Sequence, residues 1–293
     1  MDFAALAARL PEWGRIFDGQ KYAAFLEAVH SVLDERAEAY ELHDEFARIA
    51  GSDVPLLPLA QLCSSAPQAE WRECVRRGLE ERLAADKLGR ELDELRGDFA
   101  RARPRLKMRL QTSPAIVSAE LAGGVHAALV LDLPSFITPV RQADLAAWER
   151  PASELVALAL ENVKAQEQVE LKPMEIAGTR VFGVSGQGPF VASLVLAADE
   201  LLGEPTPFGV LVAVPSAHIL LCHSLVDRRS LRALEAMAAG ALQAFESGPS
   251  PLVPHLFWKR GDRFVTLPVR RSEEGKAQCD LPREFDEQVV EKL

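Results

Sequence analysis

The stretch VHAALVLDL, residues 125–133, decides how the middle of the chain folds. It is almost continuously apolar, and Pro134 follows it. An apolar run of this length that ends at a proline is typical of a buried β-strand. Pro139 and a turn at 144–148 come next, and Pro151 begins a helix that we expect to continue to Lys164. The sequence therefore predicts a strand, a turn and a helix in this order.

Strand and helix signals continue downstream without a regular βαβ alternation. Two strands are expected on either side of 177–178, and Gly203 ends the helix that follows them. A short link at 215–217 favours a tight antiparallel hairpin, and Asp227 caps a further helix that Gly248 ends. The expected elements are strands 169–173 and 179–184, helix 189–202, strands 208–214 and 218–225, helix 227–247, and strands 256–259 and 263–267. This irregular order argues for the α+β class.

The N-terminal third is predicted to be mainly helical. A short helix is expected to end at Pro11, and the alternating pattern of 38–54 favours a hairpin, with a continuing helix left open. Two helices carry apolar stripes: Tyr22, Phe25, Leu26, Val29 and Leu33 in the first, and Trp71, Val75, Leu79 and Leu83 in the second. These stripes predict a helical core for the first part of the chain.

Changes in composition divide the chain into four parts. We expect 1–95 to be a mainly helical N-terminal region with room for one hairpin, 96–112 to be a basic connector, 113–270 to be an α+β domain, and 271–293 to be a charged C-terminal tail. The predicted fold class is α+β, with an N-terminal mainly helical region followed by a mixed antiparallel-sheet domain packed with helices.

Composition disfavours several classes of protein. The 293 residues are 48% hydrophobic, and 33 Lys and Arg against 43 Asp and Glu give a net charge of −10, which repels nucleic acid. No apolar run is long enough for a membrane span, and Met1–Ala5 does not resemble a signal peptide, so we expect a cytoplasmic protein. The four cysteines are too scattered for a metal knuckle or a disulfide framework. The frequent Ala, Leu and Arg suggest a bacterial gene.

Some of these residues carry a resemblance to a known family. Leu131-Asp132-Leu133-Pro134, Val140, Asp144-Leu145, Trp148 and LALENV at 158–163 resemble the YtpQ-like family of uncharacterised bacterial proteins. FGVLVAVPS at 208–216, continued to His223, is similar to the second hairpin of that family. The resemblance covers residues 115–270 and is looser in the N-terminal third. It implies a bacterial domain without an assigned activity.

GVSGQG at 183–188 comes closest to a catalytic motif. A G-x-S-x-G sequence places an exposed serine on a strained turn between a strand and a helix, which would make Ser185 a nucleophile. Gln187, however, occupies the position of the last glycine, and the lysine of a phosphate loop is missing. Ser185 is therefore the one catalytic candidate, and a small-residue turn is the favoured interpretation.

The histidines and cysteines do not suggest a metal or thiol site. Cys222 and His223 are neighbours on an expected strand, so their side chains point to opposite faces, and His218 lies about 13 Å from Cys222 along the strand. The six histidines lack the spacing that seats two metal ligands, and a charged turn explains HDE at 43–45. No metal or cofactor is expected. Glu161-Asn162 is predicted to make a hydrogen bond from a helix to a loop.

Five basic residues recur at every second position: Arg101, Arg103, Arg105, Lys107 and Arg109. On an extended backbone their charges would lie along one edge, where they would suit an acidic protein, a phosphate or a nucleic acid. The favoured interpretation is a solvated connector, or an edge strand whose charges oppose aggregation. No aromatic residues are interleaved to stack on bases, which weakens the nucleic-acid version.

These patterns favour a non-enzymatic bacterial protein that serves protein–protein interaction or regulation, with the N-terminal helical region as a second contact surface. One alternative is a serine hydrolase-like enzyme that uses Ser185 with partners from elsewhere in the fold. The other is a polyanion-binding regulator that uses residues 101–109. Another protein is the expected partner, whereas its identity and the oligomeric state are left open.

Overall fold

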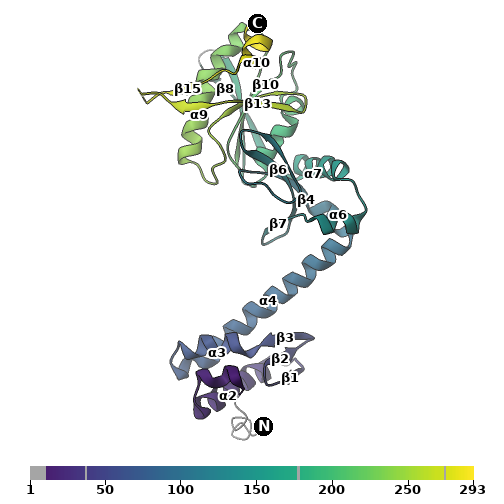
Figure 1. The fold of residues 1–293 in the computed structure, drawn as a ribbon, viewed down its shortest axis with the longest axis vertical. Helices are drawn as coiled ribbons and strands as arrows, with labels where there is room; N and C mark the ends of the chain where they lie inside the picture. Colours follow the sequence, from purple (N-terminus) through teal and green to yellow (C-terminus); the bar gives the residue numbers. More distant parts are fainter. Residues whose placement is uncertain (1–10, 37, 177–178, 274) are drawn as a thin grey trace. The chain divides into compact units, whose positions relative to one another are not determined.

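The structure is a computed structural model that describes residues 11–36, 38–176, 179–273 and 275–293 (Figure 1). The chain divides into two compact units, Met1–Glu94 and Leu95–Leu293. The helix expected before Pro11 and the turn expected at 177–178 lie outside the described residues.

The first unit combines helices with a small antiparallel sheet. Its helical elements are η1 (Glu12–Ile16), α2 (Gly19–Glu35), α3 (Leu56–Ser64), η2 (Gln68–Glu70) and α4 (Trp71–Gly97), the last of which continues beyond the unit. Asp18 begins α2, because its carboxylate accepts a hydrogen bond from the backbone N–H of Lys21 at 2.8 Å. The predicted stripe of α2 is buried, and it packs with Trp71, Val75 and Leu79 of α4 in one core.

The sheet of the first unit contains β1 (Tyr40–Leu42), β2 (Phe46–Ile49) and β3 (Ser52–Pro55) in that order. The predicted hairpin is confirmed, and β3 is a third strand that the sequence pattern did not indicate. Ala50 and Gly51 join β2 to β3 with φ values of 48° and 83°. Two successive residues with positive φ form the tight turn that suits an antiparallel hairpin.

The second unit is built on antiparallel sheets. One has the strand order β13-β12-β10-β11-β9-β8, another has β4-β6-β5 with β7 also paired to β6, and β14 pairs with β15. The strands are β4 (Leu106–Gln111), β5 (Ser118–Ala122), β6 (Val125–Asp132), β7 (Ile137–Pro139), β8 (Val169–Ile176), β9 (Thr179–Gly186), β10 (Val210–Ser216), β11 (Ile219–Ser224), β12 (Leu256–Arg260), β13 (Arg263–Leu267), β14 (Val269–Arg271) and β15 (Ala277–Cys279). The decisive stretch 125–133 thus forms β6, between β4 and β5.

The second unit also contains helical segments, some of which are labelled in Figure 1. They are α5 (Phe99–Ala102), η3 (Arg103–Arg105), α6 (Gln142–Trp148), α7 (Ala152–Gln166), η4 (Val191–Ala197), α8 (Ala198–Leu202), η5 (Arg228–Leu231), α9 (Arg232–Ser247), α10 (Arg283–Phe285) and the π-helical turn η6 (Asp286–Val290). Helix α7 packs on β4, and α9 packs on β10. The buried side chains of α9, including Leu234 and Met237, meet Leu211 and Trp258 of the six-stranded sheet.

Two expected segment boundaries differ in the structure. Residues 106–111 are not part of a connector, because they form β4, which pairs with β6 from Leu106 opposite Leu131 to Gln111 opposite His126. Residues 271–293 are not merely a charged tail, because they complete the β14–β15 ribbon and bury Phe285 and Val289 in the core beneath α9. Both segments belong to the second unit.

The architecture is α+β, as predicted. The helix expected at 189–202 begins as the 3₁₀ helix η4 and becomes α-helical in α8. Nearly every residue from Phe190 to Ala198 is buried, so packing on all sides replaces the one-sided stripe of a surface helix. In the part of the chain that the structure describes, no helix has the length and apolar character needed to cross a membrane.

Candidate functional site

Ser185 lies inside a strand and not at a strand-to-helix turn. In β9 it pairs with Glu170 of β8 and Ile219 of β11, and its side chain is exposed. The nearby imidazole of His218 is instead engaged with the carbonyl oxygen of Gly188, at 3.0 Å from Nδ1. The glycine-rich stretch therefore continues the strand to Gly186, and Ser185 does not have the backbone setting of a nucleophile elbow.

The five basic residues expected on one extended edge lie in three elements. They are Arg101 in α5, Arg103 and Arg105 in η3, and Lys107 and Arg109 in β4. The prediction that these five residues share one extended backbone was wrong. Asp98 accepts a hydrogen bond from the N–H of Ala100 at 2.9 Å and so begins a helical turn, which contains Arg101. Pro104 then fits the first turn of a 3₁₀ helix, where its missing N–H has no cost.

Lys107 belongs to the interior of the second unit. Its side chain is 7% exposed, and Nζ lies 3.1 Å from Oε1 of Glu167 and 3.0 Å from Oδ2 of Asp132. The same ammonium group lies 4.6 Å from the ring centroid of Phe190. A lysine held in this way joins parts of the fold and does not contribute to a polyanion-binding surface.

Of the polar pair on α7, Asn162 has the predicted role and Glu161 does not. The side-chain amide of Asn162 donates to the carbonyl oxygens of Arg103 and Leu106, at 2.7 and 2.9 Å. These bonds attach α7 to the start of β4, so the predicted hydrogen bond from a helix to a loop is confirmed. Glu161 forms an ion pair with Lys164 at 2.6 Å.

The cluster at 43–45 is a turn between β1 and β2, as expected for a charged loop. The ring of His43 stacks on Phe46 with centroids 4.5 Å apart, and its Nε2 lies 3.4 Å from Glu41. Across the described ranges, no three His, Cys, Asp or Glu residues are grouped closely enough to hold a metal ion.

Cys222 and His223 are adjacent on β11, and they have separate surroundings. Burial raises the pKa of the Cys222 thiol, which remains protonated. The imidazole of His223 is directed to β9, where Nδ1 lies 2.6 Å from the carbonyl oxygen of Arg180. The two side chains therefore do not form a nucleophile and its base.

A polar cavity of about 300 Å³ lies where β11 ends. The side chains that give it its chemistry are Arg180, Glu204, His223, Ser224, Asp227 and Arg229. They come from β9, β11, the loop after α8 and the start of η5. Ser224 donates its hydroxyl to Oε1 of Glu204 at 2.7 Å, which holds that carboxylate at the cavity wall. The volume is at the lower end of the range of pockets that hold small ligands.

His223 is the buried titratable group of this cavity, with 7% of its surface exposed. Burial lowers the pKa of its imidazole below 6.5, and the Arg180 carbonyl and the carboxylates of Glu204 and Asp227 oppose that shift. A carbonyl oxygen only accepts hydrogen bonds, so Nδ1 carries a proton. Nε2 is buried and has no hydrogen-bond partner among the residues that the structure describes.

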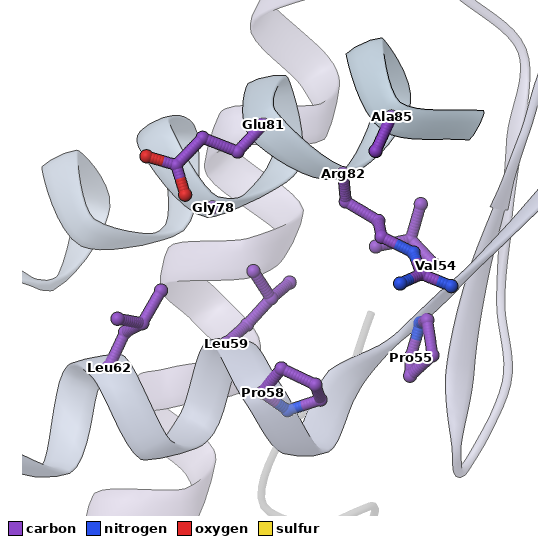
Figure 2. Close-up of a pocket in the computed structure, with 9 residues that line it drawn as sticks. All are labelled: Val54, Pro55, Pro58, Leu59, Leu62, Gly78, Glu81, Arg82 and Ala85. Carbon is purple, nitrogen blue, oxygen red and sulfur yellow. The ribbon is translucent and has the colours of Figure 1, made fainter. Parts of the chain in front are cut away.

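The first unit has an apolar groove between α3 and α4, with a pocket of about 270 Å³ (Figure 2). Leu59 and Leu62 project from α3 toward α4 at the level of Gly78, which has no side chain. Arg82 reaches from α4 toward β3 at the other end. A second hollow shares Leu62 with the first and continues toward Glu70, so the groove runs along both helices.

Neither the groove nor the polar cavity was predicted from the sequence. The one sequence feature that could have indicated the groove is Gly78, a residue without a side chain that lies between Val75 and Leu79 of the apolar stripe. The cavity had no local signal, because its side chains come from four segments that only the fold brings together. Comparisons of the chain with protein-family models, with curated proteins and with solved structures found no match, and the resemblance to the YtpQ-like family stays a prediction.

Proposed function

We propose that the chain is an interaction protein whose first unit binds a basic, apolar segment of another protein in the groove between α3 and α4. The observation that carries this proposal is an apolar groove that remains open in a unit with a complete core of its own. Leu62 lines the groove and is 37% exposed. Pockets lined mainly by apolar side chains are the usual setting for inserted ligand or partner groups.

The shape of the groove suits inserted side chains. A cavity of about 150 Å³ holds a benzene ring, so a pocket of about 270 Å³ has room for a leucine or phenylalanine side chain. Leu59 forms the buried wall, and Pro55 and Pro58 line the pocket with rigid rings. A partner that inserts one apolar side chain here, and a second in the neighbouring hollow, would be held by buried apolar area.

Charge favours a basic partner. Residues 1–94 contain 19 Asp and Glu against 11 Lys and Arg, so most of the net negative charge of the chain belongs to this unit. At the groove, Glu81 is exposed and forms no ion pair with any described residue, whereas Arg82 already faces Asp86 at 3.5 Å. Lysine or arginine beside the apolar anchors of a partner would therefore meet complementary charge.

The proposal places the protein in the bacterial cytoplasm, where thiols stay reduced. It is supported by the free state of Cys63, Cys74, Cys222 and Cys279. In this scheme the first unit provides recognition, and the second unit provides regulation or a further contact.

The test uses the full chain and a synthetic amphipathic peptide of leucine and lysine, with binding followed by isothermal titration calorimetry. Leu62→Glu is expected to weaken the peptide's affinity at least tenfold, because it places a charge in the groove. Leu57→Glu is the matched control: Leu57 is on the same helix and 36% exposed, but it does not line the groove. Its affinity is expected to stay within about twofold of the parent chain.

Charge is tested separately with Glu81→Lys, which is expected to weaken binding of the lysine peptide and to reduce its salt dependence. Equal losses from Leu57→Glu and Leu62→Glu would indicate non-specific association and would reject the groove as the site. An unchanged affinity in Leu62→Glu would reject it as well.

A further inference from the structure

The cavity at the end of β11 lies next to the end of the pairing between β9 and β11. The pairing of β9 with β11 ends at Cys222 opposite Phe182. One residue further along β11, the ring of His223 donates from Nδ1 to the backbone carbonyl of Arg180, at 2.6 Å. The imidazole thus takes the place of a backbone donor beyond the last paired residues, and Glu204 and Ser224 line the cavity beside it.

This bond fixes the chemistry of the other ring nitrogen. Because Nδ1 holds the proton and burial lowers the pKa of the imidazole, Nε2 of the neutral ring has a free lone pair. No group in the described structure donates to it. A buried acceptor without a donor is unfavourable, so a bound group with an N–H or O–H would gain from meeting it.

Charges of both signs surround the same cavity. Arg180 is exposed, its guanidinium lies 4.4 Å from the ring centroid of Phe182, and it forms no ion pair with any described residue. Arg229 is a second cation on the lining. Glu204 and Asp227 provide the negative side, with Glu204 held by the Ser224 hydroxyl.

We infer that this cavity binds a small zwitterion of the free α-amino-acid class. Arg180 holds the carboxylate of the ligand, and the ammonium donates to Nε2 of His223 and faces the carboxylate of Glu204. Nε2 is closed off from solvent, so the proposal requires side chains of the lining to rotate when the ligand enters. This site is separate from the groove of the first unit. The inference about it therefore does not depend on the proposed function, and either can be wrong without affecting the other.

Simpler ligands match fewer of these groups. A plain anion would pair with Arg180 but would face Glu204 and Asp227 and leave Nε2 without a donor. A plain cation would reach the carboxylates but would lie beside Arg180 and Arg229. A molecule with both charges, small enough for about 300 Å³, satisfies the guanidinium, the carboxylate and the imidazole together.

The experiment titrates the full chain with each of the proteinogenic L-α-amino acids by calorimetry, and with acetate and methylamine as compounds that carry one charge each. At least one amino acid is expected to bind saturably, and neither acetate nor methylamine is expected to approach its affinity. In ¹⁵N-edited spectra of the imidazoles, the Nε2 resonance of His223 is expected to shift when that amino acid binds.

Variants assign the contacts. Arg180→Gln is expected to weaken binding at least tenfold, and Arg228→Gln is the matched control, since Arg228 is also exposed and does not line the cavity. His223→Asn keeps a donor for the Arg180 carbonyl and removes Nε2, so it is expected to weaken binding while the chain remains folded. If no amino acid binds, if acetate binds as well as the amino acid, or if Arg180→Gln leaves the affinity unchanged, the inference is wrong.

Discussion

The ammonium nitrogen of Lys107 lies 3.1 Å from a carboxylate oxygen of Glu167, and each of the two side chains is only 7% exposed. Lys107 belongs to β4, and Glu167 is the residue that ends α7. The pair therefore joins the end of the helix to the strand on which it packs. Asp132, 30% exposed, adds a second carboxylate 3.0 Å from the same ammonium.

Removing one member of this pair should cost much more than removing a surface charge. Lys107→Met leaves Glu167 buried without its partner, and the free energy of unfolding is expected to fall by about 3–5 kcal/mol. Adding Glu167→Gln to Lys107→Met should recover part of that loss, because the uncompensated charge is gone. Urea denaturation of the two single variants and the double variant measures this coupling.

The exposed pair of Lys172 and Glu170, 2.7 Å apart, provides the control, since its side chains are 64% and 61% exposed. Lys172→Met is expected to change the free energy of unfolding by less than about 1 kcal/mol. A similar small change in Lys107→Met would show that solvent reaches Glu167 and would contradict the buried pair.

The same pair shows where sequence patterns succeed and where they fail. The stretch 125–133 predicted β6, because apolar content and a flanking proline are local signals. In residues 106–110, LKMRL, the alternation also belongs to a strand, but the charges at Lys107 and Arg109 indicated an exposed connector or an exposed edge strand. Whether a lysine is buried depends on carboxylates such as Asp132 and Glu167, which lie far along the chain.

The candidate sites depend on contacts between distant parts of the sequence even more than the burial of Lys107 does. Arg180, Glu204 and His223 meet at one cavity because β9, β11 and the loop after α8 converge there. No periodicity of the sequence encodes that convergence. Asn162, in contrast, was placed correctly, because a polar side chain inside an apolar helix face needs a partner close to the helix.

Gly78 should be sensitive to substitution although it is in a helix. A Cβ at this position would lie 2.6 Å from Cδ2 of Leu59 and 3.0 Å from Cδ1 of Leu62. The better helix propensity of alanine, about 1 kcal/mol, therefore competes with overpacking of roughly 1–3 kcal/mol. We expect Gly78→Ala to leave the free energy of unfolding unchanged or to lower it by up to about 2 kcal/mol.

Gly89 of the same helix is the matched position, because a Cβ there meets no atom of the described residues within 4 Å. Gly89→Ala is expected to stabilise the chain by up to about 1 kcal/mol. The comparison by thermal and urea unfolding separates the groove contact from helix propensity. Equal stabilisation by both substitutions would mean that α3 does not approach α4 at Gly78.

Buried thiols should be protected from labelling in the native chain. Burial raises the pKa of the Cys63 thiol to about 12 and that of Cys279 to about 11, and it also raises the pKa of the fully buried Cys222. A pKa near 12 lowers the thiolate fraction near pH 8 on the order of a thousandfold relative to a free cysteine. Reaction with an aromatic disulfide reagent is expected to be slow in buffer and fast at all four cysteines in urea. Rapid native labelling of Cys63 or Cys222 would contradict the packing around them.

The buried imidazole of His223 and the half-buried imidazole of His255 should make the fold less stable as the pH falls. Burial lowers the pKa of His255 below 6.5, and the N–H of Val269 donates to its Nδ1 at 3.2 Å, a bond that requires the unprotonated nitrogen. Burial also lowers the pKa of His223. Below about pH 6.5 the unfolded chain takes up protons that the folded chain does not bind, so the folded state loses stability with decreasing pH through these two groups. Above that pH both states hold neutral rings, and the two histidines contribute no pH dependence.

His255→Asn keeps an acceptor for the N–H of Val269 and removes the titrating group, so it isolates the protonation effect from the hydrogen bond. Urea unfolding of the parent chain between about pH 7.5 and about pH 5.5 should show a steeper loss of stability than that of His255→Asn. Adding His223→Asn should reduce the slope further, because each substitution removes one proton that the unfolded chain alone takes up. Parallel pH profiles for the parent chain and both variants would mean that these rings ionise equally in the folded and unfolded states, contrary to their burial.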